Sequence, residues 1–127
     1  MKIKRLDHVV LTVSNLPKAE RFYHEVFDMP VIEEQSNDEV ITLRFGHQLL
    51  RLRQQESNET LQAANPSLGA ADFSIVAGDK LEDIQNHLKS YFIPVVAGPI
   101  EKMGAEGKMT SIFIHDLDKN LIEISVY

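Results

Sequence analysis

The sequence predicts an α+β fold built from two βαβββ modules that form a curved, mostly antiparallel sheet. Three observations lead to this prediction. Apolar and polar residues alternate with period two in several segments, which is typical of half-buried strands. Two other segments repeat their apolar residues at the spacing of an amphipathic helix. The order of these segments occurs twice along the 127 residues, which indicates an internal repeat.

The first module opens with a strand over residues 3–13, where every second residue from Val9 to Val13 is apolar. Asn15 is a typical N-cap, and a helix with apolar residues at i, i+3 and i+4 follows it. The helix is expected to end before Pro30, because the residue preceding proline avoids the right-handed helical conformation. Three further strands are expected in this half, at residues 31–34, 40–45 and 48–53.

A second run of the same pattern begins after a connector of small and polar residues. Asp79, with Glu82 three residues later, is typical of a capping box at a helix start. Leu81, Ile84 and Leu88 then mark one apolar helix face. Strands of this half are expected at residues 72–77, 93–96, 110–115 and 121–127, with a glycine-containing loop over residues 97–109.

Matched positions in the two halves support the repeat. With a one-residue adjustment His8 corresponds to Asp72, and residues 49–52 correspond to residues 121–124. We therefore expect one domain, residues 1–127, with module one at 1–54, a connector at 55–70 and module two at 71–127.

Composition excludes several classes of function. The chain has no cysteine, so disulfides, thiolate nucleophiles and cysteine-ligated metal sites are absent. The formal charge of −6 disfavours binding to nucleic acid or to an anionic membrane. No apolar run approaches the roughly 20 residues that span a bilayer, and the basic N-terminus lacks the apolar stretch of a signal peptide. A cytoplasmic protein with neither nucleic-acid nor membrane partners is expected.

The faces of the strands that carry polar residues are candidates for chemistry. A solvated face is common in antiparallel sheets and explains polar residues without any function. The repeat adds a second explanation, because pseudo-symmetric halves bring equivalent positions together. The polar positions are His8, Thr12, Arg51, Arg53, Asp72, Ser74, Glu123 and Ser125.

Several motifs point to a known family. The first strand contains Leu6-Asp7-His8-Val9-Val10, and the last strand follows an Asp-x-Asp-x-Asn-Leu turn that begins at Asp116 and reaches Glu123. Along nearly its whole length, the sequence resembles the vicinal-oxygen-chelate superfamily of glyoxalase I, bleomycin-resistance and fosfomycin-resistance proteins and extradiol dioxygenases. It is most similar to a subgroup of glyoxalase-domain-containing and bacterial virulence proteins, through the motifs at residues 45–48, 98–99, 103–107 and 120–127.

The resemblance implies paired βαβββ modules around a metal, often completed by a homodimer. His8 and Glu123 stand at metal-ligand positions of the superfamily, and Asp72 stands where a second histidine is usual. Arg51 stands where glyoxalase I has a glutamate, and Arg53 replaces a common histidine. His115 replaces a common arginine.

Two carboxylates close together, such as Asp72 and Glu123, require a cation, a shared proton or a positive side chain between them. A hard divalent ion such as Mn²⁺, Mg²⁺, Fe²⁺ or Zn²⁺ would serve, and so would the guanidinium of Arg51. These alternatives stay open at this point. The predicted metal ligands are His8, Asp72 and Glu123, and the predicted substrate-binding residues are Arg51, Arg53, Ser74 and His115.

The leading interpretation is metal-dependent chemistry on a small oxygenated molecule. The alternative is a non-catalytic protein of the bleomycin-resistance type, in which Arg51 and Arg53 hold a carboxylate or phosphate of a small-molecule ligand. Glyoxalase I activity is disfavoured because Arg51 replaces its general base. Asp72 likewise disfavours extradiol cleavage, which uses two histidines and one carboxylate.

Overall fold

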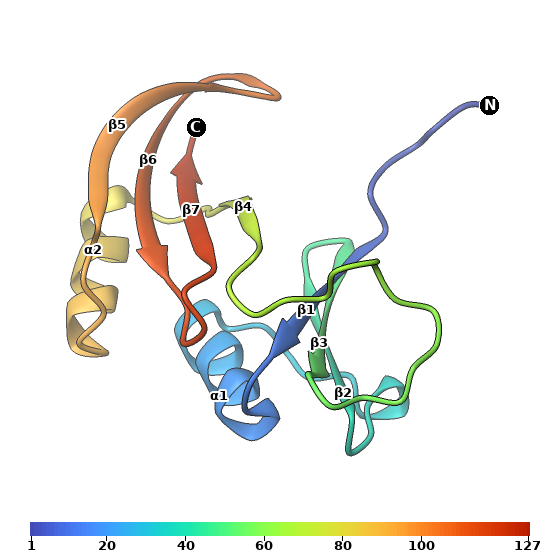
Figure 1. Ribbon diagram of the computed structural model, residues 1–127. Coiled ribbons are helices and arrows are strands. Elements are labelled where there is room, and N and C mark those ends of the chain that lie inside the picture. Colours follow the sequence, from blue (N-terminus) through green and yellow to red (C-terminus); the bar gives the residue numbers. More distant parts are fainter. The chain divides into compact units, whose positions relative to one another are not determined.

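The structure, a computed structural model, describes residues 1–127 and follows the predicted α+β class (Figure 1). It divides into two compact units, residues 1–70 and residues 71–127, which we call unit 1 and unit 2. Each unit combines one α-helix with one sheet. Neither helix is long and apolar enough to cross a membrane.

Unit 1 contains a three-stranded sheet in the order β1-β3-β2. The central strand β3 (Gln48–Gln54) pairs in parallel with β1 (His8–Val13) and antiparallel with β2 (Val40–Phe45). Helix α1 (Leu16–Phe27) connects β1 to this hairpin. The buried apolar residues of this unit include Leu11, Val13, Leu16, Tyr23, Leu43, Leu50 and Leu52.

The start of α1 confirms the sequence prediction. The Asn15 side chain accepts a hydrogen bond from the backbone N–H of Lys18 at 3.0 Å, and Pro17 lies in the first turn. Both features favour a helix start. The cap accepts from a backbone N–H that has no partner within the helix, and proline has no N–H that would need one. Asp28 ends the helix in the left-handed conformation, with φ of 54°.

The expected strand at residues 31–34 is wrong. Only Val31 makes an isolated bridge, to Leu43, and a 3-10 turn η1 (Glu33–Gln35) follows it. The Ile32 carbonyl is used in local hydrogen bonds and not in a bond to a neighbouring strand, because the Ser36 hydroxyl and the Gln35 N–H both donate to it. Serine side chains commonly compete with sheet bonds in this way.

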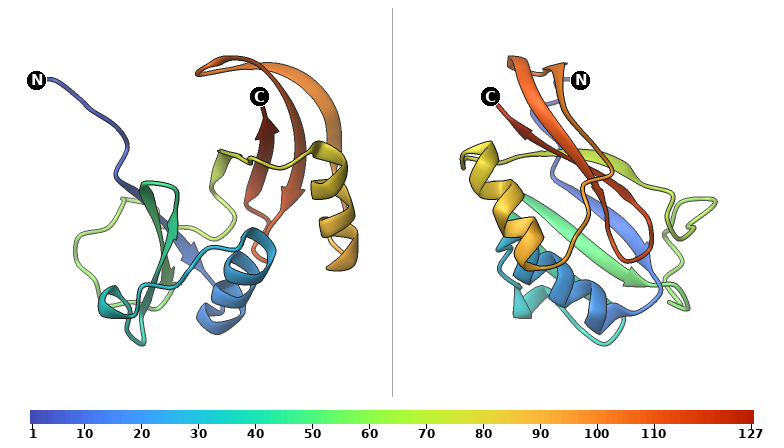
Figure 2. Two further views of the ribbon diagram at one scale, coloured as in Figure 1. Left: turned by 180° about the vertical axis from the view of Figure 1, so that it is seen from behind. Right: turned by 90° about the vertical axis from the view of Figure 1, so that its left-hand side faces the viewer.

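Unit 2 contains a four-stranded sheet in the order β4-β7-β6-β5. Strand β4 (Asp72–Val76) is parallel to β7 (Leu121–Val126), which is antiparallel to β6 (Gly107–His115). Helix α2 (Leu81–Ser90) precedes β5 (Ala97–Gly104), which pairs antiparallel with β6. Strands β5 and β6 bend in a long arc, which the views of Figure 2 show from two sides.

Two expectations for unit 2 are corrected. Residues 93–96 form no strand, and the predicted loop at 97–109 is instead part of the β5–β6 hairpin. The glycines and the proline of this hairpin are residues typical of loops, which explains the wrong prediction. Gly98, with φ of +97°, lies at the register shift between Ala97 and Ile100, so it marks an irregularity inside a strand. The capping box at Asp79 is also wrong, because the N-cap of α2 is Lys80 without a side-chain cap.

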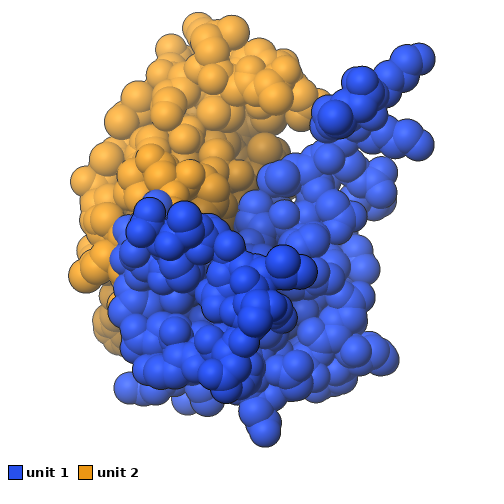
Figure 3. All heavy atoms as spheres, turned by 45° about the vertical axis from the view of Figure 1, so that its right-hand side comes forward, with its two compact units in different colours: residues 1–70 blue, residues 71–127 orange.

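Each unit has its own buried apolar residues, and Figure 3 colours the two units separately. In unit 2 these residues come from β6, β7 and α2, with Ile112, Ile114, Ile122 and Leu88 at most 1% exposed. Residues on the opposite side of the same strands are polar, and they form the site described next.

Candidate functional site

Strand alternation places the charged residues of unit 1 on one face of its sheet. Leu50 and Leu52 of β3 point into the core, so Arg51 and Arg53 point to the other side. The strand register aligns Arg51 with Val10 and Thr42, and Arg53 with Thr12 and Val40. His8 and Arg44 flank Leu49 in the adjacent row. We call this the unit 1 polar face: His8, Thr12, Arg44, Arg51 and Arg53.

His8 lies between the carboxylate of Asp7 and the guanidinium of Arg51. Its Nδ1 is 2.9 Å from Oδ2 of Asp7, and Nη1 of Arg51 lies 3.1 Å from its Nε2. Because a guanidinium only donates, Nε2 accepts from Arg51, and Nδ1 therefore carries the proton that is donated to Asp7. The hydrogen bond from His8, helped by the charges of Arg5 and Arg51, lowers the pKa of Asp7.

Arg51 has a second neutral hydrogen-bond partner, whereas one nitrogen of Arg53 has no hydrogen-bond partner. Nη2 of Arg51 donates to Oε1 of Gln35 at 3.0 Å, which ties η1 to this face. The Nε atom of Arg53 is buried without a hydrogen-bond partner. An unsatisfied buried donor is costly, so it is a place where an acceptor would be stabilised.

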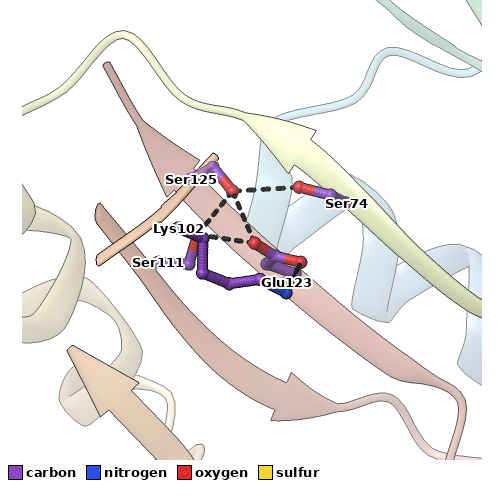
Figure 4. A network of polar contacts seen from close by, with 5 residues as sticks. All are labelled: Ser74, Lys102, Ser111, Glu123 and Ser125. Carbon is purple, nitrogen blue, oxygen red and sulfur yellow. Dashed lines mark hydrogen bonds and ion pairs between the residues drawn. The ribbon is translucent and has the colours of Figure 1, made fainter. Parts of the chain in front are cut away.

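Unit 2 carries a chain of hydroxyl groups that ends on a carboxylate (Figure 4). The Ser111 hydroxyl donates to Oε2 of Glu123 at 2.6 Å. Oγ of Ser125 lies 2.9 Å from Oγ of Ser111 and 2.9 Å from Oγ of Ser74. Nζ of Lys102 donates to Oε1 of Glu123 at 3.2 Å. We call this the unit 2 polar face: Ser74, Lys102, Ser111, Glu123 and Ser125.

Counting protons fixes the direction of this chain. A serine hydroxyl has one hydrogen to donate, and that of Ser111 is used in its short bond to Glu123. The one hydrogen of Ser125 is directed to Oε2 of Glu123, at 3.3 Å, and to the neighbouring Oγ of Ser111. The contact between Ser125 and Ser74 therefore requires Ser74 to donate. The outer hydroxyl of Ser74 is therefore left as an acceptor for other groups.

These partners keep Glu123 ionised although it is only 7% exposed. Burial acts to raise its pKa, but hydrogen bonds from Ser111 and Lys102, the Lys102 charge and the Ser125 hydroxyl outweigh burial. The pKa of Glu123 is therefore below its ordinary value of 4.5. The Lys102 ammonium also lies 5.1 Å from the centroid of the Phe113 ring.

The remaining predicted site residues of unit 2 lie on the same side of its sheet. On β4, Asp72 pairs with Leu121 and Ser74 pairs with Glu123 of β7. On β6, the other neighbour of β7, His115 pairs with Leu121. Asp72 is exposed, whereas His115 is half-buried and its Nδ1 has no hydrogen-bond partner. The predicted substrate-binding residues Ser74 and His115 thus share a face with Glu123, and their role stays a prediction.

The sequence prediction missed three residues that contact predicted site residues: Lys102 and Ser111, which contact Glu123, and Gln35, which contacts Arg51. Lys102 is missed because its strand is predicted as a loop; in the structure it pairs with Met109 of β6, on the same face of the sheet as Glu123. Ser111 would follow from alternation along β6, because it is the partner of Ser125 in the β6–β7 register. Gln35 lies in a 3-10 turn, for which the sequence has no comparable signal.

Comparison with known proteins places the chain in a family. The family model described as Glyoxalase/Bleomycin resistance protein/Dioxygenase superfamily matches residues 5–124, almost the whole chain. The chain belongs to this superfamily. The resemblance inferred from the motifs is therefore confirmed.

Relatives of this superfamily protein match over its full length. It is 39% identical to virulence protein STM3117 of Salmonella typhimurium, over 100% of this chain and 87% of that protein. It is 35% identical to glyoxalase domain-containing protein RDO1 of Mycosarcoma maydis, over 100% of this chain and 70% of that one. The crystal structure of STM3117 matches with a TM-score of 0.93, covering 100% of this chain and 99% of the other.

The fold of this superfamily protein is shared more widely. An integron cassette protein of V. cholerae is 36% identical with a TM-score of 0.93, covering 100% of this chain and 98% of that chain. A lactoylglutathione lyase from Agrobacterium tumefaciens has a TM-score of 0.76 at 22% identity, covering 98% of this chain and 95% of that one. At that identity, the lyase shows the fold alone.

The superfamily resemblance implies a metal, so the fit of the residues to a divalent ion matters. An ion at about 2.1 Å from Nε2 of His8 would need the electron pair that Nε2 shares with the Arg51 N–H. Glu123 is likewise paired with the ammonium of Lys102. Within neither unit do three or more metal-ligating side chains lie close enough to hold an ion. As arranged, His8 and Glu123 do not fit a resident divalent ion.

Proposed function

We propose that this superfamily member is a small-molecule-binding protein that contacts its ligand with its own cations and hydroxyls instead of a resident metal. One observation carries the proposal. The two side chains at metal-ligand positions, His8 and Glu123, each accept a hydrogen bond from a cationic side chain of the same unit. Arg51 and Lys102 thus occupy the electrostatic role that a divalent ion has in metal-dependent relatives.

Each polar face offers ligand contacts of its own in this proposal. In unit 1, Arg51 and Arg53 supply donors. In unit 2, Lys102 supplies a donor and the outer hydroxyl of Ser74 supplies an acceptor. A preorganised set of donors and acceptors fixes the orientation of a small polar molecule. A sequestering role needs nothing beyond this set, which is why we place binding ahead of catalysis.

Metal-dependent chemistry is the second candidate, and one observation favours it. The Asp7 carboxylate accepts from Nδ1 of His8, which directs the free electron pair of the imidazole to Nε2. Metal-binding histidines commonly have such a carboxylate partner. Occupation of this site by Mn²⁺, Mg²⁺, Fe²⁺ or Zn²⁺, with Asp72 as third ligand, remains a prediction, as do the homodimer and the cytoplasmic location.

Metal analysis of protein purified without chelators separates the two candidates. The proposal expects far less than one divalent ion per chain in the wild type, with no further loss in the His8→Ala and Glu123→Ala variants. One ion per chain in the wild type, lost in both variants, would overturn it in favour of metal-dependent chemistry. The Glu101→Ala variant is the control, because Glu101 is an exposed acid of β5 paired only with Lys108.

A further inference from the structure

The unit 1 polar face contains three arginines and no carboxylate that neutralises them. Arg51 and Arg53 come from the central strand β3, and Arg44 comes from the neighbouring strand β2. The ion pair of unit 1 joins Arg21 to Glu25, and Asp7 accepts a hydrogen bond from the neutral His8; neither contact includes these three guanidinium groups. This is unexpected in a chain whose formal charge is −6, with 19 acidic residues available.

The register places Arg51 next to each of the other two arginines on this face. Arg51 and Arg53 are two residues apart on the same face of one strand, so their side chains lie side by side. Arg44 opposes Leu49, which makes it a diagonal neighbour of Arg51 across the β2–β3 pair. Diagonal neighbours on a sheet lie within reach of long side chains.

The hydrogen bonds already made by this face leave donors in excess. Arg51 donates to two neutral acceptors, His8 and Gln35, which fix its plane without compensating its charge. Arg53 has a buried Nε–H with no acceptor at all. Asp7, which is next to His8, is exposed and already accepts from the His8 ring. An anionic group with several oxygens would satisfy both the free donors and the charge.

We propose that the unit 1 polar face is an oxyanion site that holds a phosphate or carboxylate group of the ligand, with the unpartnered Nε–H of Arg53 as its main donor. The inference rests on the proposed function, because it names the chemical class of the molecule bound there. A guanidinium suits this role better than an ammonium, since its planar fork binds two oxygens at once. Arg44, at the exposed edge, adds charge and makes the binding dependent on salt.

The test is a titration with inorganic phosphate and, separately, with malonate, at low ionic strength. Binding is measured by calorimetry and by the NMR signal of the Arg53 Nε–H group, which shifts when an oxyanion reaches it. The wild type is expected to bind at least one of the two probes, and the stronger probe identifies the source of the oxyanion. Binding of neither probe by the wild type would overturn the inference.

Three variants make the test specific for Arg53. Arg53→Gln keeps a long polar side chain and is expected to weaken binding at least tenfold. Arg53→Lys keeps the charge but not the planar guanidinium, so its affinity is expected to lie between those of the wild type and Arg53→Gln. Arg21→Gln is the matched control, because Arg21 lies exposed on α1 and pairs only with Glu25. Equal affinity in Arg53→Gln and Arg21→Gln, with both variants folded by circular dichroism, would sink the assignment.

Metal analysis of the same preparations keeps the two proposals apart. Metal-free protein that binds neither probe leaves the proposed function intact and rejects the oxyanion site. Protein that carries one divalent ion per chain rejects the proposed function, whatever the titration gives. If a metal-loaded wild type still loses phosphate or malonate affinity on Arg53→Gln, the oxyanion site stands without the proposed function.

Discussion

At the scale of single residues, Glu123 shows how the surroundings of a group decide its chemistry. The carboxylate is buried, which alone would favour its neutral form. Donors from Ser111, Ser125 and Lys102 reverse that preference and lower its pKa. Glu123 is thus a fixed, charged acceptor and not a proton donor at neutral pH.

This lowered pKa predicts a pH dependence of stability. A carboxylate with a folded-state pKa below 4.5 stabilises the protein fully above that pH and loses the contribution as the pH falls through its folded-state pKa. Glu123→Gln should therefore lower the free energy of unfolding by about 1–3 kcal/mol at pH 7, as expected for a lost charged hydrogen bond. The deficit should shrink below pH 4.5, as measured by urea denaturation across the pH range.

The control for this prediction is Glu101→Gln. Glu101 is on β5 and pairs with Lys108 at 3.7 Å, but both side chains are 71% exposed. An exposed pair contributes little, so this variant should differ from wild type by less than about 1 kcal/mol at every pH. A deficit of Glu123→Gln that stays constant or grows in acid would contradict the account of Glu123.

The sequence also shows how far such residues are predictable. His8, Arg51 and Glu123 were found because strand alternation and family motifs both mark them. Their hydrogen-bond partners were not all found, because Gln35 lies in an irregular turn and Lys102 lies in a strand that contains glycine and proline. Alternation identifies the face of a residue, whereas its partner depends on a register that only the folded sheets define.

At the scale of elements, α1 depends on signals that are local in the sequence, whereas β5 depends on its pairing with another strand. Helix α1 was predicted because its signals are local: an N-cap at Asn15, a proline in the first turn and an apolar stripe. Strand β5 was missed because its pairing with β6 is irregular around Gly98 and because its residues 97–103 are exposed. A strand without alternating burial leaves no pattern in the sequence.

Gly98 gives a testable consequence at this scale. A Cβ atom there would lie 2.5 Å from the backbone oxygen of Ser111 and 3.0 Å from Cα of Ile112, at a φ of +97°. Gly98→Ala is expected to destabilise the protein by about 3 kcal/mol, through backbone strain and overpacking against β6. Thermal and urea denaturation measure this directly.

Gly78 is the matched control for Gly98. A Cβ added at Gly78 has no heavy atom within 4 Å. Gly78→Ala should therefore change stability by only about 0.5 kcal/mol, the range of a surface substitution. Equal stability of the two variants would show that Gly98 is not required for the β5–β6 pairing.

At the scale of the whole molecule, two similar units carry different polar faces. Unit 1 presents guanidinium groups around a histidine, whereas unit 2 presents hydroxyls and a lysine around a glutamate. Superfamily membership accounts for the repeated architecture but not for this difference in chemistry. The functional claim therefore depends on these side chains.

The central claim is that Arg51 and Lys102 take the place of a metal, and a calorimetric titration with Mn²⁺ and with Zn²⁺ tests it most directly. The wild type should show no stoichiometric binding to His8 and Glu123, because both are paired with protein cations. The double variant Arg51→Ala/Lys102→Ala should gain affinity for one of the ions, since it frees both groups. Stoichiometric binding by the wild type that disappears in His8→Ala, with no gain in the double variant, would contradict the account.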